Sequence, residues 1–227
     1  MRVVNRMVEI KTNLANKQNY GGSRSTSNIK FLVIHYTGND GDTDESNGRY
    51  FKNNVVKASA HYFVDGDSIT QSVPDNFVAW HCGGKKYTSC STTGGGKYYN
   101  KCTNNNSLSI EICDDVKNGT VYPSTKTIQN ALDLAEQLMA KYSIPKENVI
   151  RHFDVTGKFC PNYWVDNAKW KSEFWNKLGG VKTTTDSRVE KYKKQVQERF
   201  GFSDQTIEWL ATYKSAAPLF EKLATKK

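Results

Sequence analysis

The sequence has no long hydrophobic run, and none of its apolar stretches approaches the roughly 20 residues that a membrane-spanning helix requires. We therefore expect no membrane partner. The first ten residues also lack the apolar core of a signal peptide, because Asn5, Arg6 and Glu9 interrupt it. We expect the protein to be made in the cytoplasm without a signal peptide, so any work outside the cell requires another exit route.

Acidic residues are in the minority, with 23 Asp and Glu against 32 Lys and Arg, and the formal net charge is +9. A positive net charge favours polyanionic partners, among them nucleic acid, an anionic membrane surface and a cell wall that bears teichoic acid. The sequence contains no internal repeat and no recognisable nucleic-acid-binding motif. We therefore expect no nucleic-acid partner, and salt-dependent retention of DNA on a gel is the direct check of that alternative.

Cysteine is scarce and odd in number, so the five thiols cannot all pair with one another. When Cys160 is set aside as a candidate metal ligand, Cys82, Cys90, Cys102 and Cys113 remain, and four cysteines allow three pairings. A reducing cytoplasm favours free thiols. Whether any of the four forms a disulfide stays open at this point.

The part of the chain up to residue 178 mixes strands with helices. The first 28 residues are polar and lack sustained periodicity, which indicates an N-terminal arm. Strands are predicted at 29–36, 107–113 and 148–151, with a hairpin over 59–70 around an Asp-Gly turn. Helices are predicted at 44–54, 124–142 and 166–178. These elements predict an α/β domain over 29–178, with a central mixed β-sheet flanked by α-helices.

Two segments differ from this pattern. Residues 83–106 are rich in Gly, Lys, Asn, Ser and Tyr, and they predict a long loop of the kind that usually serves function. Residues 179–187 have the composition of a linker. Beyond it, residues 188–227 predict a small C-terminal all-α module with helices at 188–200 and about 203–223.

Three residues with metal-ligand chemistry are placed as in a zinc hydrolase. His35 closes an apolar strand, and His152 and Cys160 are separated by seven residues after the last predicted strand. Two imidazoles and one thiolate would give Zn²⁺ three protein ligands and leave the fourth tetrahedral position open for water. The set predicts metal-assisted hydrolysis. A histidine that simply packs in the core is the alternative for each imidazole.

Two charged residues are placed to assist such a reaction. Glu111 is out of phase with the alternating Leu108, Ile110 and Ile112, so it points to the other face of its strand. From there a carboxylate can take a proton from water and pass it to a leaving nitrogen. Lys158 lies two residues before Cys160, where its ammonium can offset the charge on a tetrahedral intermediate. A solvent-exposed role is the alternative for both.

The remaining candidates are substrate contacts. His61 lies in the predicted hairpin and His81 follows Trp80, so each can line the substrate site, pack in the core or act as a further ligand. Trp80 and Tyr36 are candidate contacts for sugar or peptide, with core packing as the alternative. Asp154 is a candidate partner that orients a ligand imidazole.

Five segments, in this order along the chain, resemble a known family. They are Ile34-His-Tyr-Thr37, Ser59-Ala-His-Tyr-Phe-Val64, Ala79-Trp-His81, Ser109-Ile-Glu-Ile-Cys113, and Arg151-His-Phe-Asp together with Gly157-Lys-Phe-Cys-Pro161. The chain is similar, from about residue 28 to 178, to the zinc-dependent N-acetylmuramoyl-L-alanine amidases of type 2. These are phage and prophage endolysins related to T7 lysozyme and to the peptidoglycan recognition proteins.

The resemblance implies an open groove with zinc held by His35, His152 and Cys160, and catalytic roles for Glu111 and Lys158. It also implies a peptidoglycan hydrolase that cleaves the amide between N-acetylmuramic acid and the L-alanine of the stem peptide. Such an endolysin acts on the wall after release and lyses the host. A recognition protein that binds peptidoglycan without cutting it is the alternative, although members of that kind have lost the thiolate ligand.

The chain departs from some relatives at one catalytic position. They carry a tyrosine just before the histidine equivalent to His61, whereas this chain has Ala60. The departure favours Glu111 as the base. The 83–106 loop also looks longer than usual for the family, which leaves the substrate contacts in that region open.

For the C-terminal module we expect binding to anionic wall polymers. Residues 188–227 carry nine Lys and Arg against five Asp and Glu, and the segment is too short for a large core. An appendage that serves packing or dimerisation is the alternative.

Overall fold

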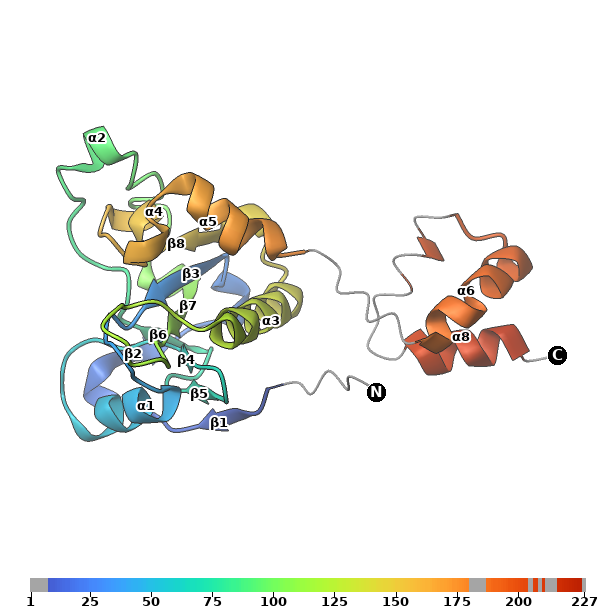
Figure 1. Cartoon of the computed structure of the whole chain (residues 1–227), viewed down its shortest axis with the longest axis horizontal. Coiled ribbons are helices and arrows are strands. Elements are labelled where there is room, and N and C mark those ends of the chain that lie inside the picture. Colours follow the sequence, from blue (N-terminus) through green and yellow to red (C-terminus); the bar gives the residue numbers. More distant parts are fainter. Residues whose placement is uncertain (1–7, 180–186, 204–205, 208–209, 211–215, 226–227) are drawn as a thin grey trace. The chain divides into compact units, whose positions relative to one another are not determined.

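The computed structural model describes residues 8–179, 187–203, 206–207, 210 and 216–225 (Figure 1). The chain divides into two compact units, Arg6–Gly179 and a second that contains Gly180–Lys227. The larger unit carries a six-stranded sheet with helices around it, and the smaller unit is helical in its described part. None of the described helices is long and apolar enough to cross a membrane.

The larger unit is built on a mixed sheet with the strand order β1-β5-β4-β7-β3-β8. The strands are β1 (Ile10–Thr12), β5 (Ile69–Gln71), β4 (Tyr62–Val64), β7 (Ser107–Ile112), β3 (Phe31–Tyr36) and β8 (Val149–Arg151). Neighbouring strands are parallel except β4 and β5, which form the antiparallel hairpin expected around the Asp-Gly turn. The predicted fold class is confirmed.

Helices cover the two faces of this sheet (Figure 1). The helix α3 (Thr125–Tyr142), capped by the Ser124 side chain, packs against β3, β4 and β7, and α1 (Asp44–Asn53) packs against β4 and β5. Along β4, Tyr62 and Val64 join the core beneath α3, whereas Phe63 stacks on Phe51 of α1 with ring centroids 5.3 Å apart. Alternate residues of a strand point to opposite faces, so α1 and α3 lie on opposite faces.

Aromatic side chains close the core at the end of the larger unit. Trp164 is fully buried, and its ring lies 5.5 Å from Trp170 and 5.0 Å from Phe174. Trp170 belongs to α5 (Asn167–Glu173), which begins at the predicted Asp166 cap. The α-helix predicted to run to 178 ends at Glu173, because Phe174 takes a φ of −132° to reach the core, and a short 3₁₀ turn (Trp175–Lys177) follows.

The segment predicted as an N-terminal arm contains two short strands. Besides β1, it holds β2 (Tyr20–Ser23), which pairs antiparallel with β6 (Phe77–Ala79) in a second sheet. The buried Asn19 side chain donates to the carbonyls of Phe51 and Asn54 and so ties the segment to α1. Strands of three or four residues are too short to produce a detectable alternation, so the sequence gives no sign of them.

The long loop predicted at 83–106 is ordered by single turns. It contains α2 (Cys90–Thr93) and a 3₁₀ turn at Asn104–Asn106. Cys82, Cys90 and Cys102 are buried in and beside it, and all five cysteines of the chain are free thiols. The chain therefore matches the free-thiol alternative.

The smaller unit has its own apolar core. The helix α6 (Ser187–Phe200) and the helix α8 (Ala216–Thr225) contribute the buried Val196 and Phe220, which meet Ile207. Phe200 and Leu219 remain 44% and 38% exposed. Residues 180–186 of the predicted linker lie outside the described residues.

Candidate metal centre and groove

The pairing of β3 with β7 positions two of the predicted site residues. His35 and Glu111 are direct partners in the parallel register of these strands. Leu32 and Ile34 point into the core beneath α3, so His35 points to the opposite face. Glu111 lies on that face for the same reason, which brings a carboxylate and an imidazole to the same edge of the sheet.

A short helix after β8 supplies the other two metal-ligand candidates. After β8 the chain forms α4 (His152–Thr156), which ends at Gly157 with a φ of 87°. This left-handed conformation favours glycine, and a Cβ at this position would also clash with Cys90 Sγ. The chain then turns back until Phe153 N donates to Cys160 O at 2.9 Å. Cys160 is thereby returned to the side of His152.

The three predicted ligands converge in one cluster. The candidate ligand atoms of His35, His152 and Cys160 all lie within 4.8 Å of one another, and all three residues are buried. Cys160 Sγ is 3.7 Å from His35 Nδ1, and the rings of His35 and His152 are 4.7 Å apart. Two nitrogens and one sulfur at this spacing can hold a metal ion.

A chain of hydrogen bonds orients His35. Ser107 Oγ donates to Thr103 O at 2.6 Å, so its oxygen accepts from His81 Nε2 at 3.1 Å. Because the proton of His81 is on Nε2, its Nδ1 is unprotonated and accepts a hydrogen bond from His35 Nε2, also at 3.1 Å. The lone pair of His35 therefore lies on Nδ1, the nitrogen that faces Cys160.

The protonation states also suit a metal ion. Burial lowers the pKa of His152 to about 3 and that of His35 well below its ordinary value. Both imidazoles are therefore neutral, and each has a lone pair that can coordinate a metal ion. Burial raises the pKa of the Cys160 thiol, and a bound cation would lower it again by favouring the thiolate. His152 Nδ1 is buried and has no hydrogen-bond partner among the described residues. This donor set fits a divalent transition metal.

Glu111 lies at the border of the cluster. Its Oε1 is 3.8 Å from His35 Nδ1, and its side chain is 19% exposed. Burial raises the pKa of Glu111 to about 8, against the opposing effect of the Lys158 ammonium. Within the described part of the chain, Glu111 Oε2 has no hydrogen-bond partner, so it is free to accept a proton or a hydrogen bond from a bound molecule.

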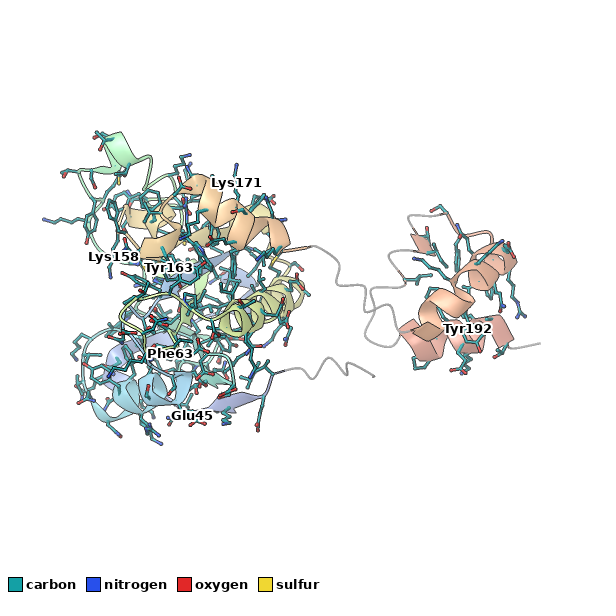
Figure 2. All side chains as sticks on the ribbon, in the orientation of Figure 1. Glu45, Phe63, Lys158, Tyr163, Lys171 and Tyr192 are labelled. Atoms are coloured by element: carbon teal, nitrogen blue, oxygen red, sulfur yellow. The ribbon has the colours of Figure 1, made fainter. Side chains whose placement is uncertain are left out.

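Lys158 stands between two hollows. It comes from the segment after α4, as does Tyr163 (Figure 2). One hollow, of about 590 Å³, is lined by Lys158, Glu111, Tyr36 and residues of α1. The other, of about 570 Å³, is lined by Lys158, His152, His81 and residues of the 83–106 loop. The cluster is therefore reached by a groove with a separate arm on each side of Lys158.

The sequence matches the family model described as N-acetylmuramoyl-L-alanine amidase over residues 25–163, more than half of the chain. The chain belongs to this amidase family. The matched range contains every predicted ligand and both predicted catalytic residues.

Curated amidases of Bacillus are among the relatives. CwlL of Bacillus licheniformis is 30% identical over 158 residues, which cover 67% of this chain and 41% of CwlL. CwlA of Bacillus subtilis strain 168 is 28% identical over 194 residues, which cover 82% of this chain and 65% of CwlA. The chain thus spans about two fifths of the length of CwlL and about two thirds of that of CwlA.

Solved amidase structures share the fold. The catalytic domain of XlyA is 28% identical with a TM-score of 0.58, and the match covers 76% of this chain and all of that domain. The PlyG catalytic domain is 30% identical with a TM-score of 0.59, covering 78% of this chain and 98% of that domain. The family resemblance predicted from the five motifs is confirmed.

Two of the predicted substrate contacts line the groove. Tyr36 lines the hollow beside α1, and its ring packs edge-on against Tyr163. His81 lines the hollow beside the 83–106 loop, but its main contact is with His35. The contact between His81 and His35 could not be predicted from the sequence, because it joins residues 46 positions apart.

The other two predicted substrate contacts lie elsewhere. His61 has no exposed surface: its Nδ1 accepts from Ser109 N, and Arg24 covers its other nitrogen, so a substrate cannot reach it. This prediction was wrong because Arg24, Ser109 and the Phe77 carbonyl enclose the imidazole of His61. Trp80 is half-buried and lines a separate hollow of about 350 Å³ with Cys82 and Asn104.

Asp154 does not orient a ligand imidazole as predicted. It forms a bidentate ion pair with Arg151, with Arg151 Nε 2.9 Å from its Oδ2 and Nη2 2.7 Å from its Oδ1. Arg151 also donates to the carbonyl of Trp164 at 2.6 Å. The pair therefore fastens α4, which carries His152, to the aromatic core.

Tyr163, which the sequence analysis did not single out, packs against Tyr36 of the groove. Its hydroxyl is buried and has no hydrogen-bond partner among the described residues. Burial raises the pKa of this hydroxyl, and the nearby Cys160 and Glu111 add to the effect. No motif marks it, because a tyrosine after Cys-Pro is indistinguishable by sequence from a packing residue.

Proposed function

We propose that this chain hydrolyses the amide bond between N-acetylmuramic acid and the L-alanine of the peptidoglycan stem peptide. The observation that carries the proposal is the convergence of His35, His152 and Cys160 beside Glu111 in an open groove. Membership of the amidase family supports the same reaction. The whole protein would then be a phage or prophage endolysin that acts on the wall.

The metal in this proposal is Zn²⁺, held by His35, His152 and Cys160. Two neutral imidazoles and a thiolate are ligands that zinc prefers, and three protein ligands leave one tetrahedral position for water or substrate. When bound, zinc supplies Lewis acidity, which lowers the pKa of water and polarises a carbonyl. His81 and Ser107 keep the His35 lone pair directed at the site.

The remaining steps fall to two side chains. Glu111 accepts the proton of the attacking water and returns it to the alanine nitrogen as the amide bond breaks. Its Oε2, which has no partner among the described residues, is the atom available for that proton. Lys158, exposed at the junction of the two hollows, offsets the negative charge that develops on the lactyl carbonyl oxygen.

The partner of the larger unit is bacterial peptidoglycan. For the helical module of 188–227 we propose binding to anionic wall polymers, supported by its surplus of Lys and Arg. Synthesis in the cytoplasm followed by action on the wall completes the proposal.

Digestion of purified cell wall tests the activity. We expect new N-terminal alanine without new reducing sugar ends, because the amide and not the glycan is cleaved. A chelator should abolish the release and added zinc should restore it. Cys160→Ser should lose both zinc and activity, and a Cys160→Ser protein that keeps both would overturn the ligand assignment. Tight wall binding with bound zinc but no cleavage would instead support a recognition protein.

A further inference from the structure

The two hollows that meet at Lys158 differ in charge. The hollow beside the 83–106 loop is lined by Lys85, Lys86 and Lys158, and its lining contains neither Asp nor Glu. The hollow beside α1 contains the acidic side chains of Asp42 and Glu111. An anionic group on the substrate is therefore attracted more strongly to the first hollow than to the second.

The second hollow has the features of a sugar site. Tyr50 and Phe51 offer aromatic faces, and the amides of Asn39 and Asn47 lie among the lining residues. Both amides donate to Asp42, at 3.2 and 2.6 Å, so these side chains hold one another in place. Aromatic rings with fixed hydrogen-bonding groups suit an uncharged, hydroxyl-rich ligand better than an anion.

The lysine-lined hollow is held at a fixed position relative to His152. Tyr87 N donates to Thr156 O at 2.8 Å, Gly96 N donates to Phe153 O at 3.0 Å, and Tyr98 N donates to Asp154 O at 2.8 Å. These bonds fasten the loop to α4, the helix that begins with His152. Lys85 and Lys86 are thus exposed cations on a fastened loop, and neither forms a salt bridge within the described residues.

The substrate of the proposed reaction has the same asymmetry. On one side of the scissile amide lie the uncharged sugars, and on the other lies the stem peptide. Its second residue, D-glutamate, is joined through its side chain and leaves its α-carboxylate free unless that group is amidated. The cleaved bond must lie where the two hollows meet, because Glu111 and His152 line different hollows and Lys158 lines both.

We propose that Lys85 and Lys86 form a subsite for the free α-carboxylate of the second stem-peptide residue, so that the chain prefers stems with D-glutamate over stems with the α-amidated residue. The glycan then occupies the hollow beside α1. The inference rests on the proposed function and adds to it the direction of the substrate and its preferred charge.

The test uses two soluble substrates that differ in one group. They are N-acetylmuramoyl-L-Ala-γ-D-Glu-L-Lys and the same compound with its α-carboxylate amidated, so wall phosphate plays no part. We expect kcat/KM on the acid to exceed that on the amide roughly fivefold, the size expected from two exposed ion pairs. The ratio should fall as salt is added, because exposed pairs are screened.

Variants locate the effect. In Lys85→Ala/Lys86→Ala the ratio should fall to about one, while cleavage of the amidated substrate is retained. The matched control is Lys97→Ala/Lys101→Ala, which removes two exposed lysines of the same loop that do not line the hollow, and it should keep the wild-type ratio. Equal cleavage of both substrates by the wild type, or an unchanged ratio in the Lys85/Lys86 variant, overturns the subsite. Failure of the wild type to cleave either substrate would overturn the proposed function itself.

Discussion

The direction of the His35 lone pair depends on three hydrogen bonds that end at the carbonyl of Thr103. The hydroxyl of Ser107 thus determines which ring nitrogen of His35 carries the proton, although it does not contact His35 itself. Ser107 has no exposed surface, so water cannot take over its part.

We therefore expect Ser107→Ala to weaken zinc binding roughly 10- to 100-fold, the usual cost of losing a partner that orients a metal ligand. Competition with a chromophoric chelator measures the dissociation constant directly. Ser109→Ala is the matched control, because Ser109 is equally buried in the same strand but contacts His61. Equal zinc affinity in the Ser107 variant and the wild type would show that His35 needs no such partner.

At the scale of single elements, the N-terminus of α1 holds a pair of carboxyl groups. Asp44 is fully buried and accepts hydrogen bonds from Ser68 Oγ and Thr70 Oγ1, while its own N–H donates to Asp65 Oδ2. Burial, helped by the nearby Asp65 carboxyl, raises the pKa of Asp44 to about 6. The folded chain therefore holds a proton here that the unfolded chain releases above about pH 4.

This raised pKa predicts a stability that falls as pH rises. The contribution is fully present below the unfolded pKa of about 4 and is lost as pH rises to about 6, with a slope of at most about 1.4 kcal/mol per pH unit. Asp44→Asn removes the titration, so it should gain free energy of unfolding relative to the wild type between pH 4 and 7. Urea unfolding across that range measures the difference. The exposed Asp67→Asn is the control, and a pH-independent difference for Asp44→Asn would contradict the assignment.

The strand β7 could be predicted from the sequence, but the strands that pair with it could not. Alternation alone put Glu111 on the face opposite Ile110, and the structure has it there. That Glu111 faces His35 across a parallel pair could not be predicted, because the pairing joins residues 76 positions apart and depends on packing against α3.

The missed features share a physical cause. The contacts of His61 and His81 and the short strands β2 and β6 depend on partners distant in sequence, which leave no local pattern. The motif residues could be found early because metal-ligand chemistry restricts which residue types can serve.

At the scale of the whole molecule, the two units have separate cores, so their tasks should be separable. A chain that ends at Gly179 should keep its zinc and should cleave soluble muropeptides at close to the wild-type rate. Its sedimentation with purified cell walls should fall, since the basic module is missing. Circular dichroism serves as the folding control, and unchanged wall binding would reject the wall-binding role of 188–227.

The ladder that joins β3 to β7 separates the fixed part of the site from the part that can vary. Neighbouring strands are held about 4.8 Å apart by backbone hydrogen bonds, whatever side chains they carry. The spacing between His35 and Glu111 is thus inherited with the sheet, while the surface loop at 83–106 can lengthen, shorten or change its charges. A change in the length or charge of that loop therefore alters the lining of the adjoining hollow without moving His35 relative to Glu111.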